Sequence, residues 1–154
     1  MPALWPLTFI VLLFLQSADV SRELAGILNP DEKARIEKGE SIEQRIKVYE
    51  AASKRIQQSL ETAVHQDDSQ AVSNNLTVWT ALLSKSLEDI EANANAKKQS
   101  NALKGYEIHL RKAIASMESD KIKVPVDLQD AFEACLARAE TVRKKFVELL
   151  FPQH

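Results

Sequence analysis

Residues 41–66 read SIEQRIKVYEAASKRIQQSLETAVHQ, and an apolar stripe recurs in this stretch at alternating spacings of four and three. This spacing places the stripe along one side of a helix, as in a coiled coil. Ser53 is the one polar member, and charged residues such as Glu43 and Lys47 fall on the opposite face. The stretch therefore predicts a long amphipathic helix that packs against other helices. The stripe consists of Ile42, Ile46, Tyr49, Ser53, Ile56, Leu60 and Ala63.

A second stripe follows Asp67-Asp68-Ser69, a sequence that can end one helix and cap the next. Val78 and Leu82 widen this stripe, so we expect its helix to contact more than one neighbour. Residues 92–101 contain three Asn and one Ser, which weaken a helix without excluding it. Residues 69–118 could thus form one very long helix or two helices joined by a turn, and we favour the turn. The stripe is Val72, Leu76, Trp79, Leu83, Leu87 and Ile90, and the pattern resumes at Leu103, Tyr106, Leu110, Ile114 and Met117.

A last helix is predicted from Val126 to Leu150, after a connection that ends at Val124-Pro125. Its stripe keeps the same spacing and includes Cys135, the only cysteine of the chain. A single thiol in such a stripe is expected to be a buried apolar group rather than a reactive one. The stripe is Leu128, Phe132, Cys135, Ala139, Val142, Phe146 and Leu149.

The composition predicts an all-α protein. Gly and Pro number 3 and 5 among 154 residues, and no alternating run of Val, Ile or Thr indicates a strand. Asn29-Pro30-Asp31-Glu32 is typical of a helix start, and we expect that short helix to stop at Gly39. We therefore expect an antiparallel helical bundle of three to four long helices over residues 41–151, after a leader with a short helix over residues 19–40.

The N-terminus predicts an export signal. The first 18 residues carry no charged side chain, and residues 7–15 read LTFIVLLFL. A transmembrane helix needs about 20 apolar residues, so this shorter run predicts a signal peptide over residues 1–18, cleaved near Asp19. The segment lacks the usual Lys or Arg at its start, and an uncleaved membrane anchor is the alternative. We expect an extracytoplasmic location, periplasmic or secreted.

The charges are unevenly distributed along the chain. The net charge of −2 gives no reason to expect nucleic acid or an anionic membrane as a partner. Residues 61–95 hold six acids and one lysine, whereas residues 97–123 hold seven bases and three acids. We expect these two segments to lie side by side and to neutralise each other.

The most distinctive heptapeptide is YEIHLRK, residues 106–112. Its polar side chains flank an apolar stripe, and one interpretation is a contact site for a partner. The alternative is a flank that locks two helices together by side-chain hydrogen bonds. The candidate interaction residues are Tyr106, Glu107, His109, Arg111 and Lys112.

The sequence contains no motif of a catalytic or cofactor site. It has no Gly-x-Ser-x-Gly or Ser-x-x-Lys motif and no glycine-rich phosphate loop. The histidines have no second His or Cys at ligand spacing, and Glu61 with His65 comes nearest to a metal-binding pair. We expect a non-enzymatic protein without cofactor that binds a protein partner, and neither nucleic acid nor, after signal cleavage, a membrane. The alternative is a carrier of a metal or small ligand between helices, with His65, His109 and nearby acidic residues as candidate ligands.

Overall fold

The computed structural model describes residues 24–38, 41–94 and 100–153, and these residues form helices and connections without a strand. Five α-helices pack against one another, which confirms the all-α prediction. Residues 1–18 and Gly39, which carry the signal peptide and helix-stop predictions, lie outside the described residues. No helix of the described part combines the length and apolar character needed to cross a membrane. The helices are α2 (Pro30–Lys38), α3 (Ile42–His65), α4 (Ser69–Asn93), α5 (Asn101–Asp120) and α6 (Gln129–Leu150).

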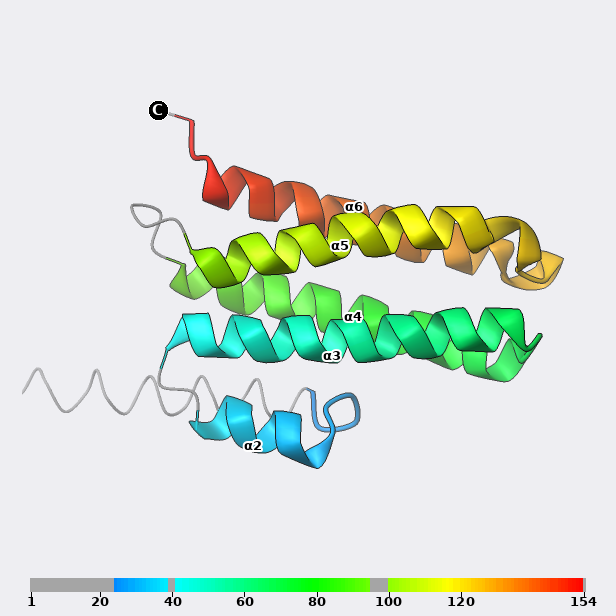
Figure 1. Cartoon of the computed structure of the whole chain (residues 1–154), viewed down its shortest axis with the longest axis horizontal. Coiled ribbons are helices and arrows are strands. Elements are labelled where there is room, and N and C mark those ends of the chain that lie inside the picture. Colours follow the sequence, from blue (N-terminus) through cyan, green and yellow to red (C-terminus); the bar gives the residue numbers. More distant parts are fainter. Residues whose placement is uncertain (1–23, 39–40, 95–99, 154) are drawn as a thin grey trace, which may run out of the picture.

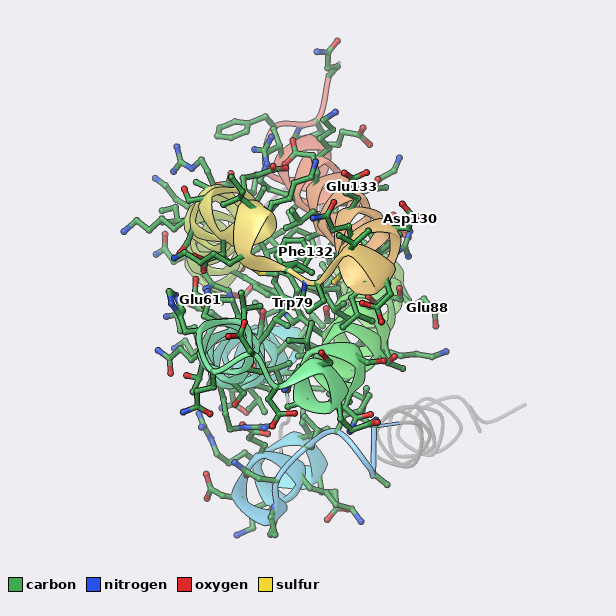
Figure 2. The ribbon with its side chains drawn as sticks, turned by 90° about the vertical axis from the view of Figure 1, so that its right-hand side faces the viewer. Glu61, Trp79, Glu88, Asp130, Phe132 and Glu133 are labelled. Atoms are coloured by element: carbon green, nitrogen blue, oxygen red, sulfur yellow. The ribbon has the colours of Figure 1, made fainter. Side chains whose placement is uncertain are left out.

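The four long helices, α3 to α6, lie lengthwise beside one another and form a bundle (Figure 1). Each of α3 and α6 contacts both α4 and α5, so α4 and α5 occupy opposite corners of the bundle (Figure 2). The short helix α2 packs against the outside of α3.

This arrangement shows that the predicted pairing of residues 61–95 with residues 97–123 is wrong. The acidic Asp89 of α4 pairs with Arg45 of α3, and Glu107 of α5 pairs with Arg143 of α6. Among the described residues, the two segments meet through Ser86 and Tyr106, which share an uncharged hydrogen bond, and at the end of α3, where His65 lies beside Asp120. The burial of the apolar stripes decided which helices are neighbours, because exposed charges contribute too little to override it.

Side chains cap most of the helix starts. Asn29 and Glu32 form a reciprocal capping box at α2, with backbone-to-side-chain distances of 2.8 and 2.9 Å. Ser41 caps α3, as its sequence predicts. Asp68 caps α4, after Asp67 turns the chain with a φ of 54°. The Ser41 and Asp68 caps fix where α3 and α4 begin, whereas α6 has no side-chain cap.

Residues 69–118 form two helices rather than one. The C-cap of α4, Ala94, has an extended backbone with a ψ of 134°, and α5 begins at Asn101 with the Ser100 side chain as its cap. The expectation of two helices is therefore confirmed, and residues 95–99, on which the predicted turn falls, lie outside the described residues.

The predicted stripes form the core of the bundle. The stripe of α4 is buried throughout, Leu82 is fully buried and Val78 is partly buried, which places α4 against two neighbours. Helix α3 buries a second row of side chains beside its stripe, including Val48 and Ala52. Helix α2 packs on α3 and adds Ile36 to the same core.

The last helix begins later than predicted. Residues Val126–Leu128 form a separate 3₁₀ turn, and α6 starts at Gln129. The α5–α6 connection therefore contains two short 3₁₀ turns, Lys121–Lys123 and Val126–Leu128, on either side of Val124-Pro125.

Candidate functional site

Ser53, the polar member of the α3 stripe, is the centre of a hydrogen-bond network inside the bundle. Its side chain is fully buried. Trp79 Nε1 of α4 donates a hydrogen bond to Ser53 Oγ at 2.8 Å, and His109 Nε2 of α5 lies 2.8 Å from the same oxygen. One hydroxyl group therefore joins three of the four long helices.

Tyr106 extends the network toward α6. The Ser86 hydroxyl donates its single proton to the Leu83 carbonyl oxygen at 3.0 Å, so Tyr106 donates to Ser86 Oγ across 2.9 Å. The Tyr106 ring stacks with the His109 ring at a centroid distance of 6.3 Å, and it contacts the Phe146 ring at 4.9 Å. Burial raises the pKa of Tyr106, so its hydroxyl stays protonated as a donor.

His109 is neutral at pH 7. Burial, assisted by the nearby Lys54 ammonium, lowers the pKa of His109 to about 4, and the Glu50 carboxylate opposes this only in part. A serine next to a neutral histidine also occurs where a base activates a nucleophile. Here the serine oxygen is enclosed and accepts a second hydrogen bond from Trp79, so no substrate atom can approach it in this structure.

A second buried cluster joins α3 to α4. Arg45 Nε and Nη2 donate to the two oxygens of Asp89 at 2.7 and 2.9 Å, and the Tyr49 hydroxyl donates to Asp89 Oδ2 at 2.6 Å. Asn93 Nδ2 completes the set with a 2.8 Å hydrogen bond to Asp89 Oδ1. Arg45 and Asp89 are 7 and 6 % exposed, so each charge depends on the other for compensation.

The sequence contained only weak signals for these two clusters. Ser53 stands out as the polar exception in its stripe. Arg45 and Asp89 each precede a stripe isoleucine by one position and resemble ordinary flanking charges. Among the described residues, no buried side-chain nitrogen or oxygen lacks a hydrogen-bond partner. The buried polar side chains of the described residues are therefore paired within the protein.

The five candidate interaction residues do not form one exposed surface. Tyr106 and His109 lie in the interior, and Glu107 is 9 % exposed and accepts a 3.1 Å hydrogen bond from Arg143 of α6. Arg111 and Lys112 are exposed, with Arg111 Nε 3.8 Å from Glu107 Oε1. The alternative interpretation, a flank that locks helices together by side-chain hydrogen bonds, fits Tyr106, Glu107 and His109, each of which bonds to another helix.

The candidate metal ligands lie apart. His65 is exposed at the end of α3 with its Nε2 3.5 Å from Asp120 Oδ1, whereas His109 lies in the core. Glu61 accepts a hydrogen bond from Ser116. Within the described residues, no group of three or more His, Cys, Asp or Glu side chains could hold a metal ion.

A small hollow lies at the end of the bundle that holds the start of α3 and the end of α6. Its volume is about 70 Å³, which is well below the roughly 300 Å³ of small ligand sites. Its apolar lining includes Ile42, Leu103 and Leu149, and the adjacent Glu43 carboxylate accepts a 2.6 Å hydrogen bond from Ser100.

The opposite end of the bundle exposes two large apolar side chains. Ile122 and Val126, both on the α5–α6 connection, are each 87 % exposed. Phe151, which follows α6 and lies at the same end of the bundle as the hollow, is 60 % exposed. Figure 2 looks onto the end with the α5–α6 connection, where Asp130 and Glu133 mark the first turns of α6.

Comparisons with protein-family models, curated proteins and solved structures found no match to this chain.

Proposed function

We propose that this chain is an exported, non-enzymatic helical-bundle protein that acts by binding another macromolecule. The observation that carries the proposal is the exposure of Ile122 and Val126, two large apolar side chains held in water on one connection. Apolar side chains that gather on a surface commonly mark a site of protein interaction.

The interior supports a role other than catalysis. An active site needs polar groups that converge on a space where a substrate can bind. The Ser53 and Asp89 clusters are instead enclosed, and their groups are paired with one another.

The export part of the proposal is supported by the sequence of residues 1–18, which are uncharged and contain the apolar run of residues 7–15. N-terminal sequencing of protein from its native host tests it. We expect the mature chain to begin near Asp19. An intact Met1 on membrane-bound protein would contradict cleavage and favour an anchor.

The binding part can be tested in the native host with a photo-crosslinking amino acid in place of Ile122. The matched control carries the same amino acid in place of Thr141, which is exposed in the middle of α6. We expect a discrete adduct from position 122 and none from position 141. Equal labelling at both positions, or no adduct at either, would contradict binding through the α5–α6 connection.

A further inference from the structure

The α5–α6 connection holds Ile122 and Val126 in a fixed position. Val124, between them, is 3 % exposed and anchors the segment in the core. Backbone hydrogen bonds close both 3₁₀ turns, from Val124 N to Lys121 O at 3.2 Å and from Leu128 N to Pro125 O at 2.9 Å. The two apolar side chains are thus presented by an ordered backbone, which lowers the entropic cost of binding.

The two lysines of this connection are neutralised by neighbouring acids. Lys121 Nζ lies 2.6 Å from Glu133 Oε1, and Lys123 Nζ lies 3.2 Å from Asp120 Oδ1. The positive charges closest to the apolar side chains are therefore paired within the protein.

The surroundings of the connection are strongly acidic. Segments 61–68 and 116–133 meet at this end of the bundle, where Ser116 bonds to Glu61 and His65 lies beside Asp120 (Figure 2). Together they hold eight carboxylates and two lysines, a net charge of −6 in a chain whose total is −2. The rest of the chain is therefore net positive, and this end is an acidic surface with two apolar side chains. We name it the acidic tip.

We propose that the acidic tip docks on a protein partner whose contact surface is apolar at its centre and bordered by Lys and Arg; this inference rests on the proposed binding function. Ile122 and Val126 supply the apolar surface that is removed from water. The surrounding carboxylates select a basic rim, because complementary charge attracts the partner and like charge repels others. The same carboxylates repel an anionic membrane surface.

The test uses the purified full chain and three synthetic helical peptides of equal length as probes. One peptide has a leucine face bordered by lysines, the second has the same face bordered by glutamates, and the third has serines in place of the leucines and keeps the lysines. Binding is measured by fluorescence anisotropy of labelled peptide. We expect the leucine–lysine peptide to bind at least about tenfold more tightly than either of the others, and to weaken as salt is raised.

Variants of the protein locate the binding site. The double change Ile122→Ser and Val126→Ser should weaken binding of the leucine–lysine peptide about tenfold or more. The control Phe151→Ser removes an exposed apolar side chain outside the acidic tip and should leave the affinity unchanged. All three positions are exposed, and circular dichroism and the melting temperature verify that each variant is folded.

A second pair of variants tests the charges. The double change Glu118→Gln and Asp127→Asn removes two exposed carboxylates from the acidic tip and should weaken binding several-fold. The control Glu91→Gln removes an exposed carboxylate from the last turn of α4, at the other end of the bundle. It should have no effect.

Four results would overturn the inference. Two concern the peptides: equal binding of the leucine–lysine and leucine–glutamate peptides, or no binding of any peptide. The other two are Ile122-dependent binding to vesicles of phosphatidylcholine and phosphatidylglycerol, and Ile122-dependent self-association in sedimentation. Equal binding of both leucine peptides that is lost with Ile122 and Val126 would refute the basic partner and leave the proposed binding function intact. The photo-crosslinking experiment tests that function separately.

Discussion

Acid should destabilise this protein through His109. The pKa of this side chain falls from 6.5 to about 4 on folding, because the folded chain buries the ring next to Lys54. Between these two values the unfolded chain binds a proton that the folded chain excludes. The stabilisation from neutral His109 is therefore complete above about pH 6.5 and is lost as the pH falls toward about 4.

The size of the effect follows from the same two values. For one group with these pKa values, lowering the pH from about 7.5 to about 5 removes about 2 kcal/mol from the free energy of unfolding. His109 is 8 % exposed, so solvent screening reduces this figure little. Most carboxylates remain ionised at pH 5, which keeps the contribution of other groups small.

The assay is urea denaturation of the protein and of the His109→Gln variant at both pH values. Glutamine can reach the position of Nε2 and bond to Ser53, but it does not titrate. The variant will have its own stability, so the measured quantity is the difference between the two pH values. We expect this difference to shrink by about 2 kcal/mol in His109→Gln. The control His65→Gln, at an exposed histidine, should keep the full difference. An unchanged pH dependence in His109→Gln would refute the assignment of a buried neutral histidine.

Further predictions concern the core and its chemistry. Arg45→Leu should lower the free energy of unfolding by about 3–5 kcal/mol, measured by urea denaturation, because it leaves the buried Asp89 carboxylate without an opposite charge. Replacing Asp89 with Leu as well should recover part of the loss, and no recovery would contradict this explanation. Cys135 should react slowly with thiol reagents in the native state and rapidly in denaturant, since burial raises the pKa of its thiol; rapid native labelling would show that the thiol is accessible. Phe146→Ala should cost about 3–5 kcal/mol by leaving a cavity, whereas Gln58→Ala on the exposed face of α3 should cost less than about 1 kcal/mol; similar losses at both sites would contradict the assigned faces. Excess Zn²⁺ should leave the melting temperature unchanged, and a clear rise would instead support the carrier function.

The sequence by itself determined the helices and much of the core. An apolar stripe is a local property, because its spacing alone decides which side chains share a helix face. For this reason Leu60, Trp79 and Phe146 could be placed in the core, and Ser41 could be identified as a cap, before any tertiary contact was known. The sequence did not determine the break between α4 and α5, since Asn and Ser weaken a helix without ending it.

Only the tertiary structure decided which stripe meets which. An apolar stripe predicts that a helix face is buried, but it does not predict which helix covers that face. The diagonal placement of α4 and α5 could therefore not be derived from the sequence, and the predicted pairing of residues 61–95 with residues 97–123 was wrong. The sequence also could not determine whether a side chain that flanks a stripe is buried. His109 and Asp89 lie at the edges of their stripes, where a side chain turns to solvent or to a neighbour according to how the helices are rotated in the bundle. Ile122 and Val126 illustrate the converse, because they are apolar residues that the fold leaves in water once Val124 takes the place in the core.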